Sequence, residues 1–600
     1  MTPPPARRKV LRRTAKTAPR RSPLDLHVAA ATAVIIAAVF PGCTAAKAVP
    51  ADAPTFDVIV EGGRIIDGSG APWFYGDLAI KGDRIARIAP PGTLKDAPTK
   101  SRIDARGLVV SPGFIDIQGQ STEPFLTGDG RVISKVTQGI TTEILGEGWT
   151  VAPANDKTIA SLNTIDPTNA DTAIVKRFTG ARGFTAWLEA MEKHGVSPNV
   201  GSFVGATTIR IYTKGAAQGT PTPAELDTMR AVTVNAMQDG AFGVASALIY
   251  PPGNFATTEE LVAIAKAMAP FGGVYISHMR SEADGFLEAI DELMRIGTEG
   301  GVPTEIYHLK AGGVRNWPKV KLAIAKIDSA RAAGQDVQAN MYPYTAGGTG
   351  LAACTPPWAS ADDKLLDNLK DAATRAKVIA EMNSTKTSWE NLCSLATPKG
   401  VMVVGFEKPE LKAKWEGKRI ADIAAEAKKD WANTVVDVLL ATDAKVGMLV
   451  FMMSEDNIEL QLKQPWIKFG TDADGWDPDS ASKGLTHPRA YGTFPRILGH
   501  YVRDRKVIPL EDAVRKASSA VAARLSIPDR GLLKEGMFAD VVVFDPATVI
   551  DKADYTAPHQ VSLGVRDVFV NGVLVVDAGK HTGAKPGRVV RGPGWTGWRQ

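Results

Sequence analysis

Residues Phe114–Ser121 read FIDIQGQS and directly follow the apolar run LVVSPG. They end the first of eight short apolar runs that alternate with helical stretches, and the other seven read GITTEILGE, NVGSFVGAT, AFGVASALIY, GGVYISHMR, TEIYHLKA, DVQANMYPYTA and IKFGTDADG. Runs of this kind separated by helical segments are typical of buried parallel strands joined by helices. Eight strands are the number that closes a barrel, so the sequence predicts an α/β fold with a TIM-like (β/α)8 barrel.

Six of these eight runs end in polar or ionisable side chains. The residues concerned are Gln118 and Gln120, Glu147, His278, His308 with Lys310, Tyr344, and Asp472. In such a barrel the carboxyl ends of the strands meet at one face, which is where catalytic groups lie. We therefore expect these side chains to converge on one site.

A different pattern flanks the predicted barrel on both sides. Residues 51–112 and part of 511–600 contain short alternating strands separated by Gly and Asp turns, such as FDVIVEGGRIIDGSG and VRDVFVNGVLVVDAG. We expect the two ends to build one small β-sandwich, with the barrel over 113–510 and a barrel-closing helix and a tail within 511–600. Residues from about 359 to 448 break the strand–helix rhythm. They predict a Lys- and Ala-rich helical insertion that could cover the site.

The first fifty residues predict an export signal and a linker. Eight Arg and Lys side chains precede any acidic residue, and a thirteen-residue apolar run follows from 28 to 40. A basic start, a short apolar run and a small-residue exit describe an export signal, whereas the run is short for a membrane span. We expect a periplasmic or secreted protein. Cleavage at the A-x-A sequence of residues 46–48 is favoured; lipid attachment at Cys43 and an uncleaved anchor are the alternatives.

Composition and charge argue against some classes of partner and metal site. Apolar residues make up 44% and charged residues 22%, which is typical of a globular protein. The net charge of +5 comes from the N-terminal segment, so no nucleic-acid partner is indicated. No stable protein partner is indicated either, and an oligomer is left open. Beyond residue 50 the cysteines are Cys354 and Cys393, too few for a Cys-rich metal site. One disulfide and two buried thiols both fit them.

The strand ends carry the residue types of a zinc hydrolase. His278 and His308 end adjacent predicted strands, and a zinc site for hydrolysis combines a few N or O ligands with one open position. Glu147 is the expected anionic ligand, with Glu143 as its competitor. Asp472 is the expected general base, because a carboxylate beside the metal can take the proton of the attacking water and deliver it to the leaving amine. Asp474 is the second choice for that role.

These residues and several longer motifs resemble the N-acyl-D-amino-acid deacylases (D-aminoacylases) of the amidohydrolase superfamily. The resemblance runs from about Phe56 to Gly587, and its most specific motifs are GGRIIDGSGAPW, SPGFID, QGITTE, YPPG, GGVYISHMR, HPRAYGTFPR and FADVVVFDPATV. It implies a TIM-like barrel beside a β-sandwich, and hydrolysis of the amide between an acyl group and a D-amino acid. It also implies that His278 and His308 bind the zinc and that Asp472 is catalytic. The residues that would hold the substrate carboxylate are Tyr250, Lys310 and Arg489.

The chain departs from the family pattern at three places. The family's His-x-His pair is replaced by Gln118 and Gln120, and an amide is a poor ligand for a divalent transition metal. A family cysteine ligand after the second strand is absent, with Glu147 at or next to its place. A family histidine after the third strand is Ala206 here. Related sugar-phosphate deacetylases with amides and a glutamate ligand work with one zinc, so we expect one Zn²⁺ per chain.

The resulting expectation is an exported zinc-dependent amide hydrolase. It would remove the acyl group from N-acyl-D-amino acids or cleave short peptides with a C-terminal D-residue. Gln118 or Gln120 would hydrogen-bond the water or the substrate carbonyl. The alternatives are a hydrolase of cyclic amides or imides, which Arg489 disfavours because a ring need not present a carboxylate, and a catalytically degenerate binding protein, which the Gln pair favours.

Overall fold

The computed structural model describes residues 55–165, 172–479 and 484–597. The predicted export signal, its cleavage site and Cys43 lie outside these residues. Residues Pro54–Gln600 form one compact unit. Within the described residues, no helix is both long enough and apolar enough to cross a bilayer.

All eight predicted barrel runs contain strands, and these strands are parallel to their neighbours. One sheet runs β6–β7–β8 and a second runs β9–β10–β11–β12–β13–β17. Phe203 alone separates β8 from β9, and a parallel bridge between Gly119 and Ala473 joins the ends of β6 and β17. The strands are β6 (Phe114–Asp116), β7 (Ile140–Leu145), β8 (Asn199–Ser202), β9 (Val204–Gly205), β10 (Gly243–Ala247), β11 (Val274–His278), β12 (Thr304–Ile306), β13 (Val337–Met341) and β17 (Ile467–Phe469).

Helices follow the strands along the chain and cover the barrel, which confirms the predicted fold class. Sequence neighbours such as α7, α8 and α9 pack side by side. Helix α7 begins at a capping box in which Thr222 and Glu225 each satisfy the other's backbone N–H. The main covering helices are α3 (Asp156–Ile165), α5 (Gly183–His194), α6 (Ala206–Lys214), α7 (Pro223–Gln238), α8 (Thr258–Met268), α9 (Phe286–Gly300), α10 (Lys319–Ala332), α17 (Glu455–Leu462), α18 (Arg489–Arg496), α19 (Leu510–Ala517) and α20 (Ser519–Arg524).

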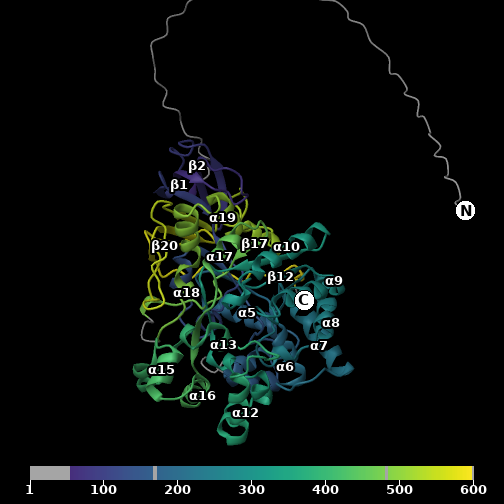
Figure 1. Cartoon of the computed structure of the whole chain (residues 1–600). Helices are drawn as coiled ribbons and strands as arrows, with labels where there is room; N and C mark the ends of the chain where they lie inside the picture. The colour runs from purple at the N-terminus through teal and green to yellow at the C-terminus, as the bar shows by residue number, and fades with distance from the viewer. Residues whose placement is uncertain (1–54, 166–171, 480–483, 598–600) are drawn as a thin grey trace, which may run out of the picture. The chain divides into compact units, whose positions relative to one another are not determined.

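Both chain ends contribute to one separate sheet of nine strands. Its path is β21–β20–β19–β18–β5–β1–β2–β3, with β4 paired to β1. The antiparallel pairing of β5 with β18 joins the two ends, so the purple and yellow segments lie side by side in Figure 1. Side chains from both parts, among them Val60, Leu78, Val541 and Phe569, share one hydrophobic cluster. The strands are β1 (Phe56–Ile65), β2 (Phe74–Lys81), β3 (Arg84–Ala89), β4 (Thr99–Asp104), β5 (Val109–Pro112), β18 (Val541–Phe544), β19 (Val565–Val570), β20 (Val573–Asp577) and β21 (Lys580–His581).

The segment expected to be a helical insertion also contributes a strand to a three-stranded sheet. Strand β16 (Gly447–Phe451) pairs with both β14 (Ala346–Gly350) and β15 (Val401–Val404) in antiparallel fashion. The prediction of helix alone was wrong here, because a four-residue apolar strand is hard to detect inside a Lys- and Ala-rich stretch. The helices are α11 (Leu365–Lys370), α12 (Ala372–Met382), α13 (Leu392–Ala396), α14 (Pro409–Trp415), α15 (Ile420–Ala427) and α16 (Trp431–Ala441).

The two remaining cysteines form a disulfide that joins the insertion to the turn just before it. Cys354 and Cys393 are bonded to each other, with their Cα atoms 5.3 Å apart. Cys354 ends a short helical turn after β14, and Cys393 lies in α13. Of the two alternatives that the sequence left open, the structure contains the disulfide, and it ties β14 to α13.

Candidate active site

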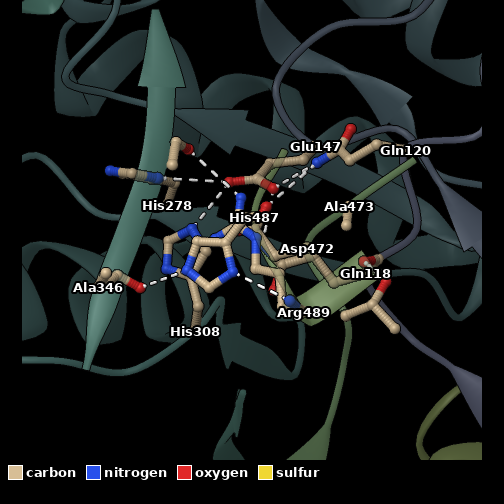
Figure 2. Close-up of polar contacts among 12 residues, drawn as sticks. Gln118, Gln120, Glu147, His278, His308, Ala346, Asp472, Ala473, His487 and Arg489 are labelled. Atoms are coloured by element: carbon tan, nitrogen blue, oxygen red, sulfur yellow. Dashed lines mark hydrogen bonds and ion pairs between the residues drawn. The ribbon is translucent and has the colours of Figure 1, made fainter. Parts of the chain in front are cut away.

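Glu147, His278 and His308 bring their polar atoms together at the carboxyl ends of three barrel strands. Glu147 Oε1 lies 2.9 Å from His308 Nε2 and 3.3 Å from His278 Nδ1. One ligand atom from each of the three residues lies within 4.8 Å of the others, and Figure 2 shows both imidazoles directed at the same carboxylate. Two imidazole nitrogens and one carboxylate oxygen in a buried position are a donor set that suits zinc in a hydrolase.

Backbone geometry at these positions is specialised. His308 has a φ of +30°, which a residue with a side chain rarely adopts, and its N–H donates to Asn340 Oδ1 at 2.8 Å. Glu147 lies between Gly146 and Gly148, whose φ values are +107° and +68°. A Cβ at Gly148 would also come within 2.4 Å of Ala247. These two glycines therefore allow a tight turn packed closely against the neighbouring strands.

Glu143, the competitor of Glu147, lies in a different environment. Its side chain is fully buried, 3.3 Å from Lys135 Nζ, and it accepts a hydrogen bond from Ser121 Oγ at 2.6 Å. Lys135 also bonds to Asp116 at 2.9 Å and to Thr471 Oγ1 at 2.6 Å. Glu143 thus belongs to a buried ionic network that links β6, β7 and the end of β17, and the structure groups Glu147, not Glu143, with the imidazoles.

The two glutamines donate hydrogen bonds to the Glu147 carboxylate and are not part of the three-residue group that could bind a metal. Gln118 Nε2 and Gln120 Nε2 donate to Glu147 Oε2 at 2.6 and 2.8 Å. The other oxygen of Glu147 faces the two imidazoles (Figure 2). Burial alone would raise the pKa of Glu147, yet the adjacent His308 and His278 hold it well below its usual range. Glu147 is therefore an ionised carboxylate with one oxygen directed at the metal position.

Asp472 and Arg489 form an ion pair beside this group. Asp472 Oδ2 lies 2.6 Å from Arg489 Nη1, and Gln120 Nε2 lies 3.4 Å from Asp472 Oδ1. Asp472 has a φ of +51°, and its N–H donates to the carbonyl of Gln118 at 2.7 Å. Burial raises the pKa of Asp472 to about 6, and the Arg489 guanidinium opposes the rise. A carboxyl group with a pKa near neutrality can both accept and return a proton.

The Arg489 guanidinium is buried but only partly bonded. It lies over the Tyr342 ring, 4.7 Å from the centroid, and Nη2 donates to the carbonyl of Gly348 at 3.3 Å. Among the described residues, its Nε has no hydrogen-bond partner. His487 Nδ1 accepts from the Arg489 N–H at 3.0 Å and so fixes the start of α18. A buried donor without a partner is costly, and a substrate carboxylate could satisfy it.

Lys310 and Tyr250 also face this region. Lys310 Nζ lies 2.6 Å from His308 Nδ1 and donates to Glu282 Oε1 at 2.7 Å. The Tyr250 ring packs edge-on against the His278 ring at 5.2 Å. Glu282, four residues after His278, was missed by the sequence analysis; a carboxylate just beyond a histidine at a strand end was the available signal.

Most of the predicted site residues line one cavity, whereas Gln118 and Gln120 contact Glu147 from outside its lining. The cavity of about 50 Å³ is bounded by Glu147, Tyr250, His278, Glu282, His308, Lys310, Asp472 and Arg489, and its apolar wall is formed by Ile249, Leu392, Val450 and Met452. Leu392 belongs to the insertion and Val450 to β16 at its end, so the insertion does reach the site. Asp474 is exposed, and the Tyr344 hydroxyl instead donates to Asp551 at 3.2 Å.

Comparison with known proteins identifies the family of this chain. Residues 456–576 match the model of the Amidohydrolase family. The chain is 34% identical to a D-aminoacylase of Alcaligenes xylosoxydans xylosoxydans over 541 residues, which covers 90% of this chain and 98% of the relative. It belongs to the N-acyl-D-amino-acid deacylase family of amidohydrolases.

Two solved structures of the deacylase family show what metal centres its members hold. A D-aminoacylase described with a binuclear metal centre, activated by one metal and attenuated by a second, has a TM-score of 0.74 and 32% identity, covering 89% of this chain and 100% of its own. An N-acyl-D-glutamate deacylase from Bordetella bronchiseptica contains zinc and a phosphonate mimic of the tetrahedral intermediate. Its TM-score is 0.73 with 30% identity, covering 90% of this chain and 100% of its own.

Proposed function

We propose that this protein hydrolyses the amide bond of N-acyl-D-amino acids, and of short peptides with a C-terminal D-residue, with one zinc ion per chain. The observation that supports the proposal is the lining of one cavity, which includes Glu147, His278 and His308 together with Asp472 and Arg489. A substrate with a reactive amide near a free carboxylate matches this arrangement. The relatives named above act on substrates of this class.

The contacts of the glutamines support a single metal. In each of them the amide nitrogen donates to Glu147, and neither of these nitrogens can also bind a cation. Because both donate to the same oxygen of Glu147, that oxygen is already engaged by two hydrogen bonds. The single carboxylate oxygen and the two imidazoles would then form a three-ligand site with room for a water molecule.

The mechanism follows from the positions of these side chains. A zinc ion held by Glu147, His278 and His308 would polarise the amide carbonyl and lower the pKa of a bound water. Asp472 would accept a proton from the water molecule that attacks the carbonyl carbon. The same carboxyl group then delivers the proton to the nitrogen of the leaving D-amino acid as the C–N bond breaks.

The cationic side chains that line the cavity orient the substrate. Arg489, Lys310 and Tyr250 hold the substrate carboxylate, with the planar guanidinium able to form two parallel hydrogen bonds. Binding through the carboxylate also disfavours cyclic amides and imides, which need not carry one. The retained metal group and Asp472 disfavour a binding protein without catalysis.

The test uses the purified protein with one equivalent of zinc and measures release of the free amino acid. N-acetyl-D-leucine and N-acetyl-D-methionine should be hydrolysed, whereas their L-enantiomers and a hydantoin should react slowly or not at all. Elemental analysis should return about one zinc per chain. Hydrolysis of the hydantoin alone would contradict the linear-amide assignment, and equal rates for both enantiomers would contradict the stereochemistry.

Export is the second part of the proposal. The basic and apolar N-terminal segment describes an export signal, and the Cys354–Cys393 disulfide is the kind of bond that persists in oxidising compartments. Fractionation of cells that produce the full chain should place the mature protein outside the cytoplasm, with its N-terminus near residue 49 or at a lipid-modified Cys43. Retention in the cytoplasm would contradict this part.

A further inference from the structure

One buried carboxylate, that of Glu282, contacts three of the groups placed in the active site. Its Oε1 lies 3.0 Å from His308 Nδ1 and 2.7 Å from Lys310 Nζ. Its Oε2 lies 3.6 Å from His278 Nε2, beyond a direct hydrogen bond but within ion-pair range. The side chain is 2% exposed, so water screens these contacts very little.

The nitrogens that face Glu282 are the ones that do not face Glu147. His308 presents Nε2 to Glu147 and Nδ1 to Glu282, and His278 presents Nδ1 to Glu147 and Nε2 to Glu282. The two imidazoles are thus held between two carboxylates, one on the metal side and one behind. A metal-binding histidine normally donates its second ring N–H to such a carboxylate, which fixes the tautomer and the orientation of the ring.

Lys310 cannot take over this task. When His308 Nε2 binds a metal, the ring proton resides on Nδ1 and needs an acceptor. Lys310 Nζ is close to Nδ1, but an ammonium group can only donate. Glu282 Oε1 is the acceptor at hydrogen-bond distance, and it binds the Lys310 ammonium as well.

The surrounding chain holds Glu282 in place. Its carbonyl accepts from the Gly312 N–H at 2.7 Å, in the loop after β12. Its own N–H donates to Glu390 Oε2 at 2.8 Å, and Ser281 Oγ donates to the same oxygen at 2.7 Å. The backbone of Glu282 is therefore fixed both by the barrel and by the insertion, as a positioning group requires.

We propose that Glu282 is a positioning residue shared by the metal site and the substrate clamp, orienting both imidazoles for zinc and holding Lys310 for the substrate carboxylate. The inference rests on the proposed function for its substrate part; the metal part needs only the geometry. Two measurable properties, zinc affinity and KM, should therefore change together when this one side chain is altered.

The primary test is Glu282→Gln, which keeps the shape but removes the negative charge and leaves one acceptor oxygen where two now face three nitrogens. Zinc affinity of the metal-free protein, measured by competition with a chromophoric chelator, should fall by about 10- to 100-fold. With zinc saturating, KM for N-acetyl-D-leucine should rise by about tenfold, the worth of one charge-assisted hydrogen bond. Glu282→Asp, which keeps the charge on a shorter stem, should recover part of the zinc affinity.

Two further variants separate positioning from general damage. Glu390→Gln alters a carboxyl group that accepts from the Glu282 N–H. This carboxyl group contacts neither imidazole and does not contact Lys310. The amide keeps an acceptor oxygen for the Glu282 N–H and the Ser281 hydroxyl, so the backbone contact of Glu282 is preserved. Glu390→Gln should leave zinc affinity and KM as in the unaltered protein. Lys310→Met should raise KM while zinc affinity stays within a few-fold.

Each outcome bears on a defined part of the inference. Unaltered zinc affinity in Glu282→Gln, with the melting temperature preserved, would overturn the metal role. Unaltered KM at saturating zinc would overturn the clamp role. Equal losses in Glu390→Gln would show that the loop, not the Glu282 carboxylate, is responsible. If the unaltered protein hydrolyses no N-acyl-D-amino acid while the zinc results hold, the proposed function fails and the metal role stands.

Discussion

Replacement of Arg489 by Ala should weaken substrate binding and catalysis through separate contacts. Arg489 lines the cavity, and its Nε has no hydrogen-bond partner among the described residues. A hydrogen bond between charged groups contributes about 1.5–3 kcal/mol, so loss of the carboxylate anchor should raise KM by roughly 10- to 150-fold. From the sequence alone, this rise in KM would be the only expected effect of Arg489→Ala.

The ion pair with Asp472 adds a second effect. Arg489 Nη1 lies 2.6 Å from Asp472 Oδ2, and its charge lowers the pKa of a carboxyl that burial has raised to about 6. Removing the cation raises the pKa of Asp472 further. Asp472 must be ionised to accept the proton of water, so kcat/KM falls as the pH drops through this pKa. The acid limb of the pH profile of kcat/KM should therefore move to higher pH in Arg489→Ala. The loss of kcat/KM relative to the unaltered protein should then be greater at pH 7 than at pH 9.

The assay is a pH profile of kcat and KM between pH 5 and 9 for zinc-loaded protein. A bound zinc ion affects the pKa of Asp472 in every variant. The quantity to compare is therefore the shift of the acid limb between each variant and the unaltered protein. Arg489→Lys keeps the positive charge but lacks the planar guanidinium. It should therefore keep the acid limb at its original pH without restoring the original KM. Arg496→Ala is the matched control: Arg496 lies in the same helix, over the Tyr344 ring, and pairs with Asp551 at 3.3 Å outside the cavity. An unaltered limb together with an unaltered KM in Arg489→Ala would refute both assignments.

Three further predictions concern the base, the metal count and the disulfide. Asp472→Asn should bind zinc normally while kcat falls by about 10²- to 10⁴-fold; a near-normal rate in steady-state assays would remove it as the base. The double change Gln118→His and Gln120→His should raise the zinc content from about one to about two per chain by elemental analysis, and a content that stays at one would mean that the amides do not set the count. Replacing Cys354 and Cys393 by Ser should reduce the free energy of unfolding by about 2–4 kcal/mol in urea and raise KM, because the bond ties β14 to the helix that carries Leu392. Reduction of the unaltered protein should have the same effect, and stability that is insensitive to reductant would contradict this role.

The barrel could be predicted because its strands are buried on both faces. Parallel strands covered by helices read as short apolar runs, and all eight such runs contain barrel strands. The polar residue at the end of a run is equally visible, which is why His278, His308 and Asp472 stood out. Strand β15 did not, because its four apolar residues lie among Lys- and Ala-rich helices and pair with β16, far along the chain.

The sequence by itself determined the chemical types available at the strand ends, including amides in place of the histidine pair, and hence the expected family and metal chemistry. Only the tertiary structure decided how these groups are partnered. Glu143 and Glu147 are alike in sequence, yet Lys135 neutralises the first and two imidazoles meet the second. Glu282 likewise acquires its contacts from residues on neighbouring strand ends. Electrostatic partnership depends on distances of a few ångströms between side chains, and for most of these groups the fold alone brings the partners together.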